Sequence, residues 1–275
     1  MPLPTPAPAP APAPIPALLA PAAIYLGNAK KGAEKAELSI GRSFVMAFLA
    51  GVYIGFGALL SFTLLNSVPG LLSTNPGLAK LVAASVFPLG LSLIIICGAE
   101  LYTGNTAMLP AAVYEGYIDW GRVLNRWLVV YTGNLVGCLF MVWAINATGI
   151  MAGNTVLQNL AVAKTSLPLD KVLIRSILCN WLVCLAVWMA SAASTLPGKL
   201  MGLWLPITAF VTVGLEHSVA NMFVIPMGIA LGAPVSAGAF LVNNLIPVTI
   251  GNTIAGAICT AGLYALCYGK ASQSL

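Results

Sequence analysis

Two short stretches of this 275-residue chain share one spacing of acidic and amide residues. The stretches 98–105 and 214–221 both read G-x-E-x4-N and lie about 116 residues apart. Each lies inside a strongly hydrophobic segment, where a polar group costs several kcal/mol and therefore marks a pathway or a site. A pair of interrupted hydrophobic segments at matching places in two halves of a chain indicates a transport site near the membrane midplane.

His217 is the only histidine in the chain, and it lies in the second stretch next to Glu216. Histidine exchanges a proton near neutral pH. An anion that crosses a dry apolar neck has a large desolvation cost, which a bound proton removes. Small weak acids such as formic or nitrous acid could therefore pass as neutral molecules after meeting His217. Alternatively, a charged His217 could hold the anion electrostatically, or the ring could be a hydrogen-bonded packing residue.

The interrupted segments also predict a site built from backbone. If helices restart near Thr103 and Ser218, two helix N-termini face each other near the midplane, and both residues are types that cap helices. Each N-terminus carries about half a positive charge and several free N–H groups, which together bind anions. Glu100 and Glu216 are expected to hold the interruptions in place by accepting backbone N–H bonds rather than to contact a substrate.

The composition excludes a soluble globular protein. Hydrophobic residues make up 59% of the chain, charged residues only 7%, and the mean hydropathy is +0.95, whereas soluble domains carry about a quarter charged residues. The net charge of +5 is scattered, so nucleic acid is not an expected partner. All six cysteines fall in hydrophobic segments without a Cys/His cluster, so neither a metal site nor a cofactor is expected.

The hydrophobic pattern predicts an all-α membrane protein with four parts. A Pro/Ala-rich tail covers 1–20, an interfacial N-terminal helix 21–42, a transmembrane domain 43–268 and a C-terminal tail 269–275. Six segments have the length that a bilayer demands, and we place them at 43–67, 79–114, 124–149, 171–194, 203–231 and 240–268. The second and fifth are long and broken, and three spans per half make the two halves an inverted repeat.

Lysine and arginine predict the orientation of these spans. With the N-terminus inside, eight of these residues fall on the inner side and four on the outer side. The positive-inside rule then places both termini on the cytoplasm-equivalent face.

Residues from about 30 to 268 resemble the formate/nitrite transporters. The most specific matching segments are Cys97–Thr106, Cys179–Cys184, Gly214–Gly228 and Asn244–Asn252. The resemblance implies an aquaporin-like six-helix protomer, a homopentamer with one pore per subunit, and proton-linked passage of small monovalent anions such as nitrite and formate.

The resemblance also implies roles for individual residues. His217 corresponds to a central pore histidine, Thr103 to the threonine opposite it, and Lys35 to a vestibule lysine that attracts anions. The apolar constriction positions are Phe87, Leu91 and Phe210. The complete set of expected pore residues is Thr103, His217, Glu216, Asn180, Asn221 and Asn252; the asparagines could alternatively only bond helices together.

Within the family, residues 75–80 and the pair Asn243-Asn244 look most similar to green-algal plastid-envelope members, which are associated with nitrite and bicarbonate. This likeness predicts a chloroplast envelope or the plasma membrane of an alga rather than a bacterial inner membrane. It also makes a bicarbonate channel the alternative function.

Two other classes fit the sequence less well. A water or neutral-solute pore of this shape should carry a duplicated Asn-Pro-Ala, but Asn75-Pro76 has no partner in the second half. An intramembrane enzyme would need a relay, and the consecutive residues Glu216, His217 and Ser218 fan about 100° apart on a helix. We therefore expect a transport protein and not an enzyme.

Overall fold

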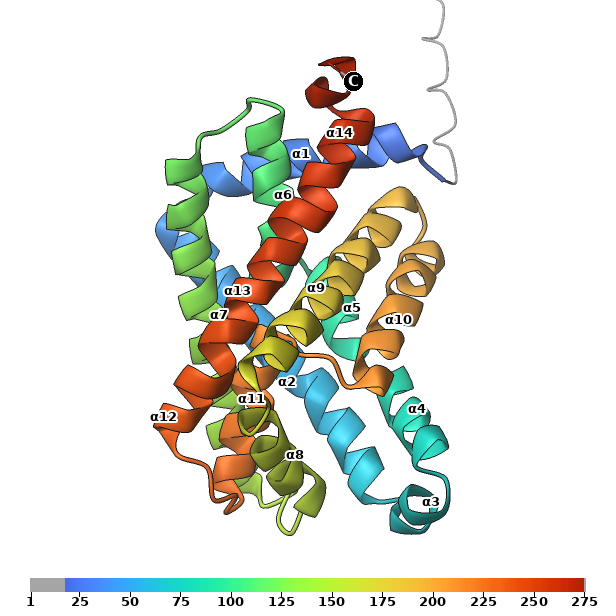
Figure 1. The fold of residues 1–275 in the computed structure, drawn as a ribbon, viewed down its shortest axis with the longest axis vertical. Helices are drawn as coiled ribbons and strands as arrows, with labels where there is room; N and C mark the ends of the chain where they lie inside the picture. The colour runs from blue at the N-terminus through green and yellow to red at the C-terminus, as the bar shows by residue number, and fades with distance from the viewer. Residues whose placement is uncertain (1–17, 275) are drawn as a thin grey trace, which may run out of the picture.

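The computed structural model describes residues 18–274. Over this range the regular secondary structure is helical, apart from one isolated β-bridge between Leu18 and Ala193 (Figure 1). Six helical segments are long and apolar enough to cross a membrane, as predicted. They are α2 (Ile40–Asn66), α4 with α5 (Pro76–Val86 and Leu89–Cys97), α7 (Trp120–Thr148), α9 (Leu169–Ala192), α10 (Leu196–Val213) and the run Ala237–Tyr268.

Shorter helices complete the bundle. They are α1 (Pro21–Glu37), α3 (Pro69–Thr74), α6 (Tyr102–Tyr114), α8 (Thr155–Thr165) and α11 (Ser218–Ala230). The last span is a succession of α-helical and wider π-helical turns, which is typical of helices at functional sites. Its pieces are α12 (Ala237–Ala239), η1 (Phe240–Leu245), α13 (Ile246–Ile254), η2 (Ala255–Gly262) and α14 (Leu263–Tyr268), followed by the 3₁₀ turn η3 (Lys270–Ser274).

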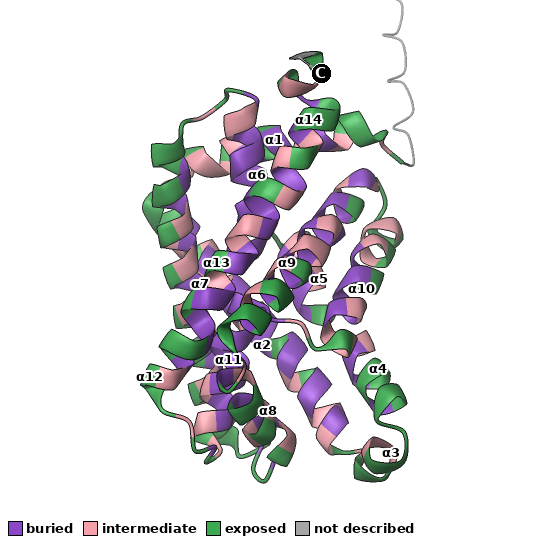
Figure 2. Ribbon diagram, viewed as in Figure 1, coloured by how far each residue is buried: buried purple, intermediate pink, exposed green. Residues whose placement is uncertain are grey.

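The second and fifth spans are broken at the two repeated stretches. Helix α5 is followed by Gly98 with φ of 77°, and α10 is followed by Gly214 with φ of 78°. Only glycine adopts this left-handed backbone at little cost, which explains the first letter of the repeated stretch. The next three residues run without helix, and α6 and α11 then begin. Both half-helices are buried over nearly their whole length (Figure 2).

The helix starts correct one part of the prediction. The residues that precede the first turns of α6 and α11 are Leu101 and His217, so Thr103 and Ser218 are not the caps. The broken spans also begin earlier than expected, at Pro76 and Leu196.

The described domain edges differ slightly from the expected ones. Helix α1 ends at Glu37 and α2 begins at Ile40, after Ser39 whose Oγ accepts the Arg42 N–H, so residues 40–42 belong to the first span. Of the predicted N-terminal tail, residues 1–17 lie outside the described range. The Leu19 N–H donates to the Ala192 carbonyl at 3.0 Å.

Both ends of the described chain lie on one face, which we call the terminal face. Helix α1 and the C-terminal turn are at the same end of the bundle, and α3 and α8 are at the other end, the opposite face (Figure 1). Glu115 joins the two ends, because its Oε1 accepts the Tyr25 hydroxyl at 2.8 Å and the Lys270 N–H at 3.1 Å. An even number of crossings requires this arrangement.

Small residues let the spanning helices approach closely. At the crossing of α2 and α7, a Cβ added to Gly137 would lie 2.1 Å from the Phe48 carbonyl oxygen, and one added to Gly51 would lie 2.3 Å from the Asn134 oxygen. In the second half, a Cβ on Gly251 would lie 1.9 Å from Ser176 Oγ. Such close packing drives helix association where lipid is as apolar as the protein.

We expect Gly137→Ala to destabilise the protein by about 1–3 kcal/mol, because the added methyl group has no space at a backbone contact. Gly27→Ala is the matched control, since no atom lies within 4 Å of a Cβ placed there. Thermal unfolding of the two variants in the same detergent measures the difference. Equal melting temperatures would contradict the close crossing of α2 and α7.

Candidate functional site

A buried carboxylate holds the break between α10 and α11. The Glu216 side chain is 1% exposed, and its Oε1 binds the Lys164 ammonium of α8 at 2.9 Å. Its Oε2 accepts the Asn221 amide at 2.7 Å and the Asn244 amide at 3.1 Å. These donors are all side chains, so the expectation that Glu216 accepts backbone N–H bonds is wrong. The role is structural, as expected.

The first break has the same construction. Glu100 is 2% exposed, its Oε1 binds the Lys35 ammonium of α1, and its Oε2 accepts the Asn105 amide at 2.7 Å. Here too the partners differ from the backbone N–H groups that were expected. The G-x-E-x4-N spacing therefore encodes an acid-to-amide bond across the first turn of each half-helix.

Two asparagines on the neighbouring spans fix the starts of the half-helices. Asn134 Oδ1 accepts the Tyr102 N–H at 2.9 Å, and its amide donates to the Glu100 carbonyl at 2.8 Å. Asn252 accepts the Ser218 N–H at 2.8 Å and donates to the Glu216 carbonyl at 3.0 Å. The first N–H of each half-helix is therefore occupied by protein. Fewer free N–H groups remain for an anion than the sequence predicts.

His217 and Thr103 meet between the two half-helices. The His217 Nδ1 accepts the Ala220 N–H at 2.9 Å, and Nε2 lies 2.9 Å from Thr103 Oγ1. A backbone N–H can only donate, so Nδ1 presents its lone pair and the proton of the neutral ring is on Nε2. His217 thus caps α11 with one nitrogen and directs an N–H toward Thr103 with the other.

Asn180 of α9 lies behind Thr103. Its amide donates to Thr106 Oγ1 at 2.9 Å and to the Asn252 carbonyl at 2.6 Å. Its Oδ1 is buried and has no hydrogen-bond partner among the described residues. Asn180 and Asn252 therefore bond backbone and side chains of adjacent helices, the alternative that the sequence left open for the asparagines.

The three predicted constriction residues do lie together, next to the histidine. Phe87, Leu91, Phe210 and His217 line one narrow cavity of about 10 Å³, with Leu101 among its other walls. The Phe87 and Phe210 rings pack edge to face with centroids 6.0 Å apart, and Phe210 stacks on the His217 ring at 5.6 Å. This volume is at the lower limit for a single water molecule, so the neck is narrow, and apart from His217 its walls are apolar.

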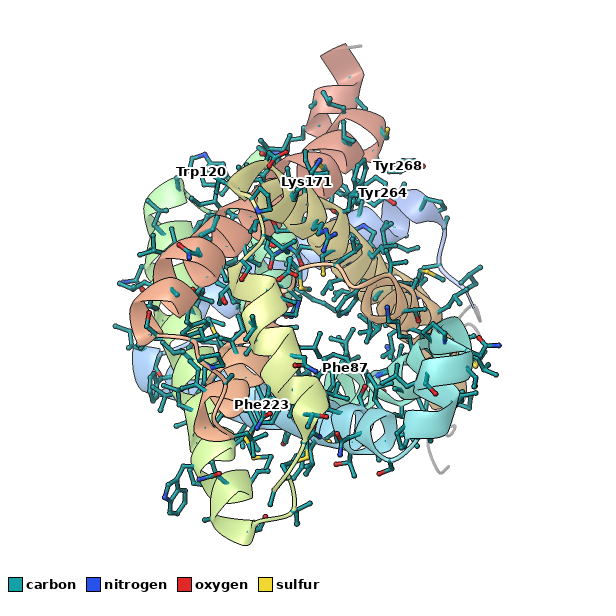
Figure 3. All side chains as sticks on the ribbon, turned by 60° about the horizontal axis from the view of Figure 1, so that its bottom comes forward. Phe87, Trp120, Lys171, Phe223, Tyr264 and Tyr268 are labelled. Carbon is teal, nitrogen blue, oxygen red and sulfur yellow. The ribbon has the colours of Figure 1, made fainter. Side chains whose placement is uncertain are left out.

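A larger cavity of about 170 Å³ leads to this neck from the opposite face. Its walls come from α2, α4, α8, α10 and α11, and they include Lys164 and Asn221. Phe87, Phe210 and His217 line both cavities and so separate them. Figure 3, which turns the opposite face forward, shows Phe87 in the interior between α4 and α8.

Lys35 was expected to be a vestibule residue of the pore, whereas Lys164 was not. The Lys35 ammonium is bound to Glu100, so a buried carboxylate matches its charge. Lys164 makes the equivalent pair in the second half. The sequence does contain a signal for Lys164: Lys35 and Lys164 each lie five residues before the first residue of a span, Ile40 and Leu169 respectively.

One position breaks the symmetry of the two halves. Arg126 and Asn244 each lie eight residues before the asparagine that fixes a half-helix. Arg126 donates to the Leu38 carbonyl at 2.6 Å, after the end of α1, and Asn244 donates to the Lys164 carbonyl at 3.0 Å, near the end of α8. The first half therefore carries one more buried positive charge.

Lys164→Met should destabilise the protein strongly, because it leaves the Glu216 carboxylate buried without its cation, a loss of about 3–5 kcal/mol. The double change Lys164→Met with Glu216→Gln should recover part of this loss. Lys171→Met is the control, since it removes only an exposed pair with Asp170. Thermal unfolding in detergent measures the order of stability of these variants. A single variant as stable as the double variant would show that the pair does not hold the break.

Comparison with known proteins identifies the family. Residues 22–266 match the family model described as formate/nitrite transporter. The chain is 41% identical over 254 residues to a probable formate transporter of Methanothermobacter thermautotrophicus, covering 86% of this chain and 92% of that protein. It is 37% identical over 276 residues to the formate channel FocA of Escherichia coli (strain K12), covering 91% and 95%.

A solved structure agrees with these relatives. A pentameric formate channel with formate bound superposes with a TM-score of 0.73 at 33% identity, covering 84% of this chain and 98% of that one. The match to the family model spans nearly all of the helical bundle described above. The chain therefore belongs to the formate/nitrite transporter family and is a multi-pass membrane transport protein for small anions, not an enzyme.

Proposed function

We propose that this protein conducts formate and nitrite through one pore in each protomer of a pentamer, and that passage is linked to a proton through His217. The family and the relatives named for formate support the substrate, and the pentameric formate channel supports the assembly. The observation that carries the proposal is the His217 Nε2–H, which points at Thr103 Oγ1 beside an apolar neck.

The neck selects by desolvation. Phe87, Leu91 and Phe210 offer no hydrogen bond to an ion, so an anion must leave its water shell to pass through the neck beside His217. A weak acid avoids this cost once it is protonated, whereas chloride does not. Formate and nitrite are conjugate bases of weak acids, which makes them suitable cargo.

The proton route follows from the two ring nitrogens. The neutral ring can offer its Nε2–H to the anion as a hydrogen bond in place of Thr103. Transfer of a proton requires the imidazolium form, in which Nδ1 has gained a proton and the Ala220 N–H has lost its acceptor. The imidazolium then gives its Nε2 proton to formate, and formic acid and a neutral Nδ1–H ring remain. A new proton taken up from the pore restores Nε2–H.

The other predicted pore residues position this centre. We assign to Glu216, Asn180 and Asn252 the role of fixing the backbone around Thr103 and His217, because their bonds run to protein groups. Asn221 lines the large cavity, and its amide also donates to Glu216. We therefore assign to it the role of connecting the cavity wall to the helix break. Lys35 acts on the terminal face chiefly through its pair with Glu100.

Uptake by proteoliposomes tests the proposal. Formate and nitrite should enter faster at pH 5.5 than at pH 7.5, and osmotic swelling should show little water flow. Bicarbonate, the substrate of the alternative predicted for an algal plastid envelope, is assayed in parallel. The two relatives named above do not come from algae; their sources are Methanothermobacter thermautotrophicus and Escherichia coli. Bicarbonate uptake that exceeds formate uptake at both pH values would replace the proposed substrate.

Replacing His217 by asparagine separates proton transfer from helix capping. Asparagine is a good cap and can still accept the Ala220 N–H, but it does not titrate. We expect His217→Asn to assemble normally and to lose the pH dependence of formate uptake. His217→Phe should lose the cap as well, at about 1 kcal/mol of stability. A His217→Asn variant that keeps the wild-type pH profile would remove His217 from the proton route.

Enlarging the neck should weaken selection. The double change Leu91→Ala with Phe210→Ala removes two apolar walls, so water can accompany ions and the permeability to chloride relative to formate should rise. Leu93→Ala is the matched control, because Leu93 is on the same helix but lines an apolar groove on the outside of the bundle. Chloride currents and formate uptake, both measured in liposomes, give the permeability ratio of chloride to formate. An unchanged ratio in the assembled double variant would place selection at Thr103 and His217 instead.

A further inference from the structure

One face of α4 forms a wall of the large cavity. Lys80, Ala83, Ala84 and Phe87 all line it, and their spacing of three, four and seven residues places them on one side of a helix. Two small alanines leave space between the lysine and the phenylalanine. At 1.5 Å per residue, Lys80 lies about 10 Å farther out along α4 than the neck at Phe87.

The charges that line this cavity are few. Its ionisable residues are Lys80, Lys164 and His217, and none of the lining residues is acidic. The Lys164 ammonium is matched by the buried Glu216 carboxylate. Lys80 is exposed, and within residues 18–274 the structure gives its ammonium no ion pair. The uncompensated positive charge of the cavity is therefore that of Lys80.

We propose that Lys80 gathers anions at the mouth on the opposite face and raises their rate of entry into the neck. This inference rests on the proposed anion transport and adds a residue to which no role was assigned from the sequence. A single charge at the rim of a cavity with low-dielectric walls raises the local anion concentration. Its reach is about 10 Å at 0.1 M salt, which matches the distance from Lys80 to the neck, and it shrinks as salt is added.

Lys80 therefore complements the paired lysines. The charges of Lys164 and Lys35 fix helix breaks and are largely cancelled by the carboxylates that they bind. A cation that attracts an anion from solution must keep its electric field. Lys80 does so, because no carboxylate of the described part of the chain forms an ion pair with it. The alternative is that Lys80 only contacts lipid headgroups, in which case its charge would not act inside the cavity.

The first experiment measures transport. Formate uptake into proteoliposomes is compared for wild type, Lys80→Gln and Lys80→Arg in 10 mM and 300 mM background salt. We expect Lys80→Gln to slow uptake about two- to fivefold at 10 mM and much less at 300 mM, because salt screens the interaction. Lys80→Arg should behave as wild type. Lys171→Gln is the control, since it makes the same change in net charge at a residue outside the cavity lining.

The second experiment measures the field in the cavity without transport. Thr212, another lining residue, is changed to cysteine, and its rates of reaction with an anionic and a cationic methanethiosulfonate are compared. The chain without Thr212→Cys corrects for the native cysteines, none of which lines this cavity. Adding Lys80→Gln should lower the anionic-to-cationic rate ratio about two- to fivefold at low salt.

The outcomes separate this inference from the proposed function. A wild-type protein that takes up neither formate nor nitrite would overturn the proposed function, while the rate ratio at Thr212→Cys still reports on the charge of Lys80. Normal wild-type uptake with an unchanged Lys80→Gln variant, or a loss that is equal at both salt concentrations, would overturn the role of Lys80 alone. An unchanged rate ratio would show that the lysine acts at the lipid surface.

Discussion

The buried pairing of a carboxylate with a lysine and an asparagine at each helix break is the interaction on which the rest of the structure depends. Backbone that is not helical survives at membrane depth only where protein satisfies it or where it lines a wet cavity. Asn134 and Asn252 satisfy the backbone at the breaks directly. Glu100 and Glu216 hold the same breaks through bonds to side chains. Each draws a lysine from a short helix and an amide from the half-helix onto one carboxylate. The breaks in turn place His217 and Thr103 within hydrogen-bond distance.

This arrangement gives the short helices α1 and α8 a common purpose. Each packs against a half-helix and supplies the lysine that its carboxylate needs. A Cβ on Gly32 of α1 would lie 2.0 Å from the Met108 oxygen in α6, and one on Gly228 of α11 would lie 2.6 Å from the Leu157 oxygen in α8. A helix that served only as a lipid anchor at the membrane interface would not need such a close contact with the backbone of a half-helix. Both helices support a half-helix, and α8 also lines the large cavity.

The sequence predicts the scaffold better than the atomic roles. Hydropathy gives six spans because each must match the bilayer, and the repeated stretch gives the two breaks because polar residues are rare in hydrocarbon. The cap of α11 was missed because an imidazole that accepts a backbone N–H is indistinguishable in sequence from one that titrates. Lys164 was missed because its partner Glu216 is 52 residues away and becomes a neighbour only when α8 folds back.

The repeat also shows where function departs from symmetry. Aligned over the two stretches, the glycine, acid and amide positions are identical, while Leu101 corresponds to His217 and Thr103 to Val219. The identical positions end one helix and hold the start of the next, which both halves require. The differing positions meet in the interior, where His217 and Leu101 line the same narrow cavity and Thr103 receives the ring N–H. A centre between two inverted half-helices needs one donor and one partner for it. Two imidazoles would compete for the same space, and two leucines would leave the anion without a hydrogen bond. The asymmetric pair of His217 and Thr103 is therefore the part of the repeat on which the proposed passage of weak acids depends.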